Sequence, residues 1–137
     1  MEIKDFFDSY TRAAWDRDAD AMIALYHEEL TVFDMWDTGR ITDSQVWKTI
    51  LRDWLSSLGE EQVRVGFEDI MVQESGELGF AHALITFAAI APDGTILRSM
   101  KNRITLGFTK TPAGWKVAHQ HTSAPVSSEN LVGILEI

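Results

Sequence analysis

The segment WKVAHQHTSAP, residues 115–125, places two histidines and a serine at alternate positions. Alternate residues share one face of a β-strand, so His119, His121 and Ser123 would point the same way as the apolar Trp115 and Val117. Two histidines at this spacing can bind a metal ion, but a functional site normally has a third ligand and supporting carboxylates. Because the chain has only two other histidines, we predict no metal site. The alternatives are histidines that line a ligand pocket, or structural histidines that bond to the backbone or to a tyrosine hydroxyl.

One aspartate lies within an apolar strand pattern. Val32, Asp34 and Trp36 share a face by alternation, and an acid between Val and Trp is hard to explain as solvated surface. Apolar surroundings make a carboxylate more basic, which suits a general base. The structural alternative is a strand-end carboxylate that accepts a backbone N–H or pairs with Arg40.

The elements that position these residues fall into two halves of the chain. Residues 1–58 have helical periodicity and residues 63–123 alternate as strands do, which predicts an α+β fold with helices on one side of a curved, mainly antiparallel sheet. The first helix has one apolar stripe and stops near residues 16–18. The short second helix begins at Asp18 or Asp20 and carries a buried side. These two apolar sets are Ile3, Phe6, Phe7, Tyr10 and Ala14, and then Met22, Ile23, Leu25 and Tyr26.

A strand is expected over residues 31–36, before a third helix. Residues 42–45, Thr-Asp-Ser-Gln, have the form of a capping box, and the helix that follows ends at Gly59. Turn signals at 75–77, 92–94 and 111–114 then divide the remainder into four strands of a meander. The whole chain, 1–137, is expected to form a single domain.

Composition excludes several classes of protein. The chain has no cysteine, so disulfides, thiolate nucleophiles and cysteine-bound zinc are ruled out. Its formal charge of −9 repels phosphate backbones and anionic lipid surfaces, so we expect neither nucleic acid nor membrane as a partner. The N-terminus has no signal-peptide pattern and no later apolar run is long enough to span a bilayer. We therefore expect a soluble, cytoplasmic protein.

The order of elements and the closing motif resemble a known superfamily. Three helices followed by a four-stranded meander that ends in WKVAHQHTSAP resemble the nuclear-transport-factor-2-like superfamily, which has a cone-shaped α+β fold, over about residues 3–126. The motif is most similar to the SnoaL-like branch and to the association domain of the calmodulin-dependent protein kinases. Members of the superfamily include isomerases, cyclases, dehydratases, transport factors and scaffolds, so the resemblance indicates the fold better than the function.

A second, local resemblance concerns the first 34 residues. The segment from Tyr10 to Tyr26, followed by TVFD, is similar to the first two helices and first strand of the ketosteroid isomerases. This resemblance implies that Tyr10 is an oxyanion-hole tyrosine, that Tyr26 supports it, and that Asp34 moves the proton. The chain departs from that family in two places. Met35 replaces a proline, and residues 101–105 carry no carboxylate.

These observations lead to a specific functional expectation. We expect a homodimer with an apolar pocket for a small aromatic or polycyclic molecule and, if it is an enzyme, proton transfer next to a carbonyl without a cofactor. The alternative is a non-catalytic association or ligand-sensing module like the kinase association domain. Asp34 and Tyr10 are the expected catalytic residues. The expected ligand-binding residues are Tyr26, Trp36, Trp54, Arg103, His119 and His121.

The choice of pocket residues depends on strand register. A shift of one residue would exchange Arg103 for Asn102 and His121 for Gln120 in the pocket, because successive residues face opposite sides of a sheet. An inward Arg103 would favour a carboxylate or a phenolate ligand.

Overall fold

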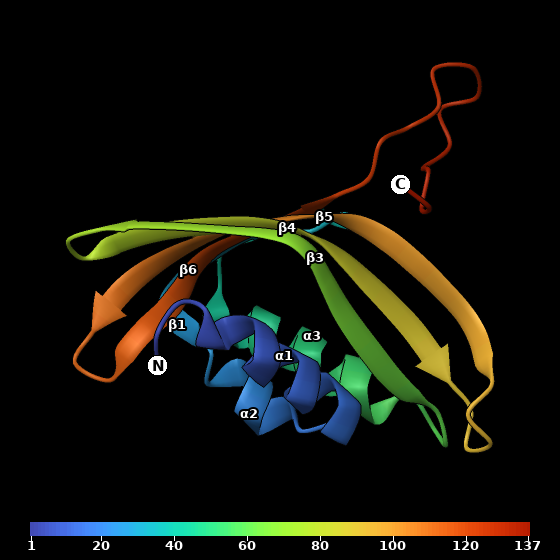
Figure 1. The fold of residues 1–137 in the computed structure, drawn as a ribbon, viewed down its shortest axis with the longest axis horizontal. Coiled ribbons are helices and arrows are strands. Elements are labelled where there is room, and N and C mark those ends of the chain that lie inside the picture. The colour runs from blue at the N-terminus through green and yellow to red at the C-terminus, as the bar shows by residue number, and fades with distance from the viewer.

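The computed structural model describes residues 1–137 and contains a curved sheet with three helices packed against one face (Figure 1). The other face of the sheet is not covered by any helix (Figure 1). The helices are α1 (Asp5–Asp16), α2 (Ala19–Ile23) and α3 (Ser44–Ser56). The strands are β1 (Tyr26–Phe33), β2 (Arg40–Ile41), β3 (Gln62–Ser75), β4 (Leu78–Ile90), β5 (Ile96–Thr111) and β6 (Gly114–Ser123).

The six strands form one sheet in the order β2-β1-β6-β5-β4-β3. Strands β3 to β6 are an antiparallel meander, and β1 joins it as a parallel neighbour of β6. The predicted α+β class, the curved and mainly antiparallel sheet and the helices on one side are confirmed. None of the helices has the length and hydrophobicity needed to span a bilayer.

Helix α1 packs its predicted apolar stripe into the core. Phe6 and Ala14 are fully buried, and the Phe6 ring lies edge-on to Phe108 of β5 at 5.7 Å between ring centres. The helix ends where Arg17 adopts a left-handed conformation and its N–H bonds to Ala14 O at 3.1 Å. Asp18 then caps α2 by accepting a hydrogen bond from Ala21 N at 3.0 Å. Helix α1 therefore ends, and α2 begins, close to the predicted positions.

Helix α2 ends earlier than expected, and Tyr26 belongs to a strand. The helix stops at Ile23, and Tyr26 begins β1 opposite Val117 of β6. Leu25 O accepts a hydrogen bond from Val117 N at 2.9 Å, which commits the chain to sheet pairing at this point. Apolar spacing could not distinguish the two assignments, because Leu25 and Tyr26 are buried in either conformation.

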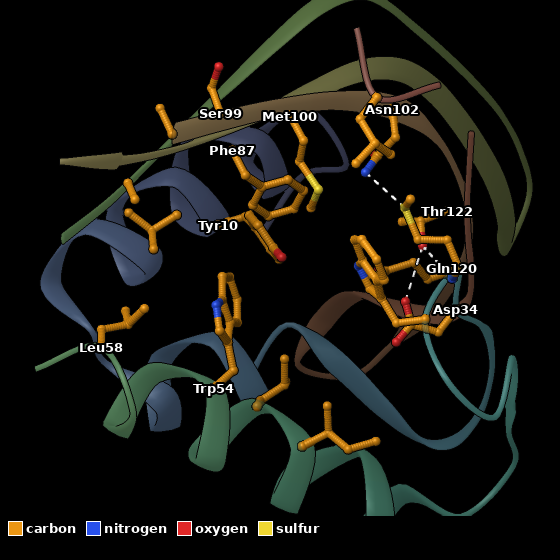
Figure 2. A pocket seen from close by; sticks show the side chains of 18 of the residues that line it. Tyr10, Asp34, Trp54, Leu58, Phe87, Ser99, Met100, Asn102, Gln120 and Thr122 are labelled. Carbon is orange, nitrogen blue, oxygen red and sulfur yellow. Dashed lines mark hydrogen bonds between the residues drawn. The ribbon is translucent and has the colours of Figure 1, made fainter. Parts of the chain in front are cut away.

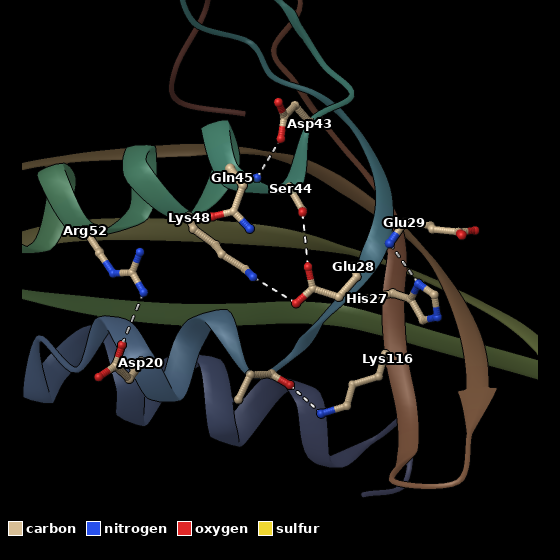
Figure 3. Close-up of polar contacts among 11 residues, drawn as sticks. Asp20, His27, Glu28, Glu29, Asp43, Ser44, Gln45, Lys48, Arg52 and Lys116 are labelled. Atoms are coloured by element: carbon tan, nitrogen blue, oxygen red, sulfur yellow. Dashed lines mark hydrogen bonds and ion pairs between the residues drawn. The ribbon is translucent and has the colours of Figure 1, made fainter.

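Polar contacts fix α3 to β1 at the edge of the molecule (Figure 3). Asp43, rather than Thr42, caps the helix and accepts a hydrogen bond from Gln45 N at 2.8 Å. Ser44 Oγ and Lys48 Nζ both donate to the Glu28 carboxylate, at 3.2 and 2.8 Å. These contacts hold the start of α3 beside β1.

An irregularity in β6 decides which of its side chains face the helices. Val117 lies opposite Phe108 of β5, and His119 lies opposite Gly107, so Ala118 is an extra residue in the ladder. Such a β-bulge interrupts strict alternation. Before it, Trp115 and Val117 are buried, and after it the buried residues are Gln120 and Thr122. The prediction that the histidines share a face with Trp115 and Val117 was wrong for this reason.

Candidate functional site

A cavity of about 560 Å³ lies between the helices and the concave face of the sheet (Figure 2). Its walls are mostly apolar side chains from α3 and from strands β4 and β5. Trp54 of α3 and Phe87 of β4 lie edge-on to each other, with 6.0 Å between ring centres. Cavities of this size and polarity are typical of small-molecule sites. The aromatic and aliphatic wall residues include Trp36, Trp47, Ile50, Trp54, Phe87 and Met100.

Two acids line the cavity, the partly buried Asp34 and the exposed Asp37. Asp34 is the one with a desolvated carboxyl. It follows β1 directly, is partly buried, and its backbone N–H bonds to Gly39 O at 3.0 Å, which fixes the turn toward β2. Burial raises the pKa of its carboxyl above the ordinary value, because desolvation disfavours the charged form. Thr122 and the backbone N–H groups of Met35 and Trp36 oppose this shift by donating hydrogen bonds. Asp34 is therefore a more basic carboxylate than one in water.

Tyr10 reaches the same cavity from α1. The residue is 4% exposed, and its hydroxyl forms no hydrogen bond with any other group of the protein. Its oxygen points into the cavity, toward the side where Asp34 lies (Figure 2). Burial, and then the charge of Asp34, raise the pKa of the hydroxyl, so it stays protonated at neutral pH. Tyr10 is therefore a hydrogen-bond donor available to a ligand.

Tyr26 acts one layer behind the cavity wall. Its hydroxyl donates to Gln120 Oε1 at 2.5 Å, and its ring lies edge-on to Trp47 with 5.7 Å between ring centres. Burial raises the pKa of this hydroxyl well above its ordinary value. Because the Gln120 carbonyl is used in this way, its amide N–H₂ is left as a second donor on the cavity wall. Tyr26, predicted to bind ligand and to support Tyr10, does not line the cavity, and its hydroxyl bonds to Gln120 rather than to Tyr10.

The polar residues of the cavity were mostly missed from the sequence. Asn102, Gln120 and Thr122 are the buried polar residues of the chain, and all three line the cavity. Thr122 Oγ1 donates to Asp34 Oδ1 at 3.3 Å, and Asn102 Nδ2 donates to Met35 Sδ at 3.0 Å (Figure 2). The signal that could have found Asn102 and Gln120 is the alternative register considered above.

Three predicted ligand-binding residues lie outside the cavity, on the uncovered face of the sheet. Arg103 donates from Nε to Ser123 Oγ at 3.1 Å. His119 Nδ1 lies 2.8 Å from Thr31 O, and the Phe33 ring is edge-on to both histidines, at 5.0 and 5.4 Å. Arg103, His119 and His121 were predicted to line the ligand pocket, but they do not line this cavity, because β5 presents Asn102 inward and the bulge at Ala118 turns the histidines outward. No three or more His, Asp or Glu side chains are grouped to hold a metal ion.

The other predicted residues do meet in the cavity. Asp34, Tyr10, Trp36 and Trp54 come from the start of the β1–β2 turn, from α1 and from α3, and all four line it. A basic carboxylate, two hydrogen-bond donors and flat aromatic walls are the groups needed to hold a planar molecule and to move a proton on it.

Comparison with known proteins identifies the family. Residues 3–127 match the SnoaL-like domain, so the chain belongs to the SnoaL-like family. No curated protein matches its sequence. The fold is that of the nuclear-transport-factor-2-like superfamily, as a protein of unknown function from Pseudomonas putida demonstrates: it is 21% identical, with a TM-score of 0.85 over 98% of this chain and 92% of that one.

Two further structures show how widely this fold is used. A Xanthomonas campestris protein, named for the association domain of calcium/calmodulin-dependent protein kinase II, is 14% identical, with a TM-score of 0.74 over 90% of this chain and 85% of that one. A Novosphingobium aromaticivorans protein, named after aromatic ring hydroxylases, is 17% identical, with a TM-score of 0.66 over 88% and 85%. At these identities the likeness concerns the fold alone.

Proposed function

We propose that this protein binds a small aromatic or polycyclic carbonyl compound and transfers a proton on the carbon next to the carbonyl group. The reaction would be of the isomerase, cyclase or dehydratase type and would need no cofactor. The observation that carries the proposal is the pair formed by a partly buried Asp34 and an unpartnered Tyr10 hydroxyl in one apolar cavity. This pairing of a base with an oxyanion donor is what enolisation requires.

The steps follow from the positions of these groups. Asp34 takes a proton from the carbon next to the ligand's carbonyl. The electron pair of that C–H bond forms a C=C bond, and the π electrons of the carbonyl group move onto its oxygen. Tyr10 and the Gln120 amide stabilise the resulting oxyanion by donating hydrogen bonds. Protonated Asp34 then returns the proton to another atom of the same molecule. The tryptophans of the wall hold the ring system flat against the cavity.

A test of this chemistry needs no knowledge of the natural substrate. In D₂O, the protein should accelerate exchange of the C2 protons of 1-tetralone, followed by proton NMR. Asp34→Asn should abolish the acceleration while tetralone still binds, because the amide keeps the shape of the side chain without its basicity. Tyr10→Phe should reduce exchange by about 10²- to 10³-fold, as expected for loss of one oxyanion donor. Equal exchange rates with the wild type and Asp34→Asn would refute the proposal.

The second candidate function is a non-catalytic association or ligand-sensing module. It is favoured by the fold similarity to the Xanthomonas protein named for a kinase association domain. Native mass spectrometry separates the two functions, because an empty, higher-order ring would support the association module. A dimer that releases a discrete aromatic or carbonyl compound on denaturation would support the enzyme.

We also propose that the uncovered face of the sheet binds a second copy of this chain. Exposed apolar side chains, including Phe33 and Phe80, occupy this face. The C-terminal segment after β6 leaves the sheet on the same side (Figure 1) and forms a small hairpin closed by the Ser127 N to Val132 O bond at 2.8 Å. Leu131 at its tip is 77% exposed. The hairpin carries Glu129, and the sheet face carries Arg103, which has no acidic partner of its own, so these two residues could pair across the interface.

A further inference from the structure

The end of the cavity near Asp34 contains a buried polar atom that no group of the protein satisfies. Asn102 of β5 is 1% exposed and lines the cavity. Its Nδ2 donates to Met35 Sδ at 3.0 Å, but its Oδ1 is buried without a hydrogen-bond partner. A buried carbonyl oxygen without a donor destabilises a fold, so such an atom calls for an explanation.

A second atom of this kind has a different environment. Trp47 Nε1 is also buried without a partner in hydrogen-bond geometry. The Trp47 indole nevertheless lies near the Tyr26 hydroxyl. It lowers the pKa of that hydroxyl, against the larger effect of burial. Asn102 Oδ1 has no such neighbour, so it is the atom whose hydrogen bond must come from outside the chain.

The groups around Asn102 have no donor to spare. The Thr122 hydroxyl has one proton, which it donates to Asp34 Oδ1, while its oxygen accepts from Met35 N at 3.4 Å. Met35 Sδ is an acceptor, and so is the Asp34 carboxylate when it is ionised. This end of the cavity therefore consists of acceptors. The free donors, Tyr10 and the Gln120 amide, are already assigned to the oxyanion of the ligand.

We propose that the ligand carries a hydroxyl group that donates a hydrogen bond to Asn102 Oδ1, so that the substrate class is a hydroxylated aromatic or polycyclic carbonyl compound. This inference rests on the proposed function, because it places the ligand's carbonyl oxygen at Tyr10. Asn102 is then a specificity-determining residue. A ligand with this hydroxyl should bind more tightly than the corresponding ether or hydrocarbon, since neither of these can donate a hydrogen bond to the buried acceptor.

The experiment compares ligands that differ only in this donor. The probes are 1-tetralone, its 5-, 6- and 7-hydroxy derivatives, and the three matching methyl ethers, with dissociation constants measured by isothermal titration calorimetry. The wild type should bind at least one hydroxytetralone about 10-fold more tightly than its methyl ether, the factor expected from one hydrogen bond to a buried acceptor. In Asn102→Leu this ratio should fall to about one.

A control variant and a competing variant make the assignment specific. Thr105→Val changes an exposed residue of the same strand that lies outside the cavity, so it should keep the preference of the wild type. If the hydroxyl binds Asp34 instead, the preference will persist in Asn102→Leu and disappear in Asp34→Asn, which overturns the inference. The comparison within the wild type needs no variant, so a ratio near one for all three pairs overturns it even if Asn102→Leu does not fold.

The outcomes also separate this inference from the proposed function. Catalysed exchange of 1-tetralone without any preference for a hydroxyl would leave the enzyme proposal standing and refute the role of Asn102. A hydroxyl preference that depends on Asn102, without exchange, would support the subsite and refute catalysis. If no tetralone binds to the wild type, both are refuted.

Discussion

Thr122 Oγ1 donates a hydrogen bond to Asp34 Oδ1 across 3.3 Å, although the two residues are 88 positions apart in the sequence. The contact joins the end of β6 to the turn that follows β1. It exists because the bulge at Ala118 turns Thr122 toward the helices instead of away from them. One extra residue in a strand thus determines the environment of the proposed general base.

Replacing Thr122 by valine should raise the pKa of Asp34 further. Valine keeps the size of the side chain but removes the hydrogen bond that favours the charged carboxylate. NMR titration of the Asp34 side-chain carboxyl carbon will measure this shift directly. We expect Thr122→Ser to keep the pKa of the wild type, because serine retains the hydroxyl. A lower pKa in Thr122→Val would contradict the role assigned to this contact.

Replacing Asp34 by asparagine should stabilise the fold at neutral pH. Burial raises the pKa of Asp34 in the folded protein above its value in the unfolded chain. At neutral pH the ionised carboxylate therefore lowers the free energy of unfolding. This loss of stability is absent below the unfolded pKa, near 4, and develops as the pH rises through the folded pKa. We therefore expect the melting temperature of Asp34→Asn to exceed that of the wild type at pH 7, and the difference to shrink at pH 4.

The control for this prediction is a carboxylate without a raised pKa. Glu61 has a lowered pKa because Arg98 donates two hydrogen bonds to it, at 3.2 and 2.7 Å. Glu61→Gln should therefore not stabilise the protein at pH 7, although both substitutions remove one negative charge. Equal gains in melting temperature for both variants would mean that the effect comes from net charge rather than from burial of Asp34.

Much of the fold followed from the sequence because it depends on local patterns. The apolar stripe of α1, the cap of α3 and the turns between the long strands can each be seen within a few residues. Asp34 and Trp36 do line the cavity, but not by strand alternation: β1 ends at Phe33, short of the predicted strand end at residue 36, and residues 34–37 of the turn that follows all line the cavity.

The errors arose where the structure depends on distant contacts. Nothing in Val117-Ala118-His119 marks a bulge, because neither glycine nor proline is present, and only the pairing with Gly107 and Phe108 reveals it. The histidines were therefore placed on the wrong face. Tyr26 was assigned to a helix because burial alone does not distinguish the end of α2 from the start of β1.

Removing the two tyrosine hydroxyls should have different effects on stability. Tyr26→Phe leaves Gln120 Oε1 buried without its donor, which should cost about 1–3 kcal/mol. Tyr10→Phe removes a hydroxyl that has no partner in the protein, so it should change the free energy of unfolding by less than about 0.5 kcal/mol. Urea denaturation at pH 7 gives both values. A loss for Tyr10→Phe as large as that for Tyr26→Phe would mean that its hydroxyl has a structural partner.

The proposed dimer should depend on the tip of the C-terminal hairpin. We expect light scattering during size-exclusion chromatography to give the mass of a dimer for the wild type and of a monomer for Leu131→Asp. The aspartate would place a charge in an apolar contact and next to Glu129, so it should weaken association strongly. Because Leu131 is almost fully exposed within its own chain, the substitution should not change the melting temperature of the monomer.

Val46→Asp is the matched control, because Val46 is an exposed apolar residue on α3, which packs on the opposite side of the sheet (Figure 1). This variant should remain dimeric. If the wild type is a monomer, the proposal that the uncovered face of the sheet binds a second copy is refuted. A dimer that persists in Leu131→Asp but is lost in Val46→Asp would place the interface on the helical side instead, where it would cover α3 and one wall of the cavity.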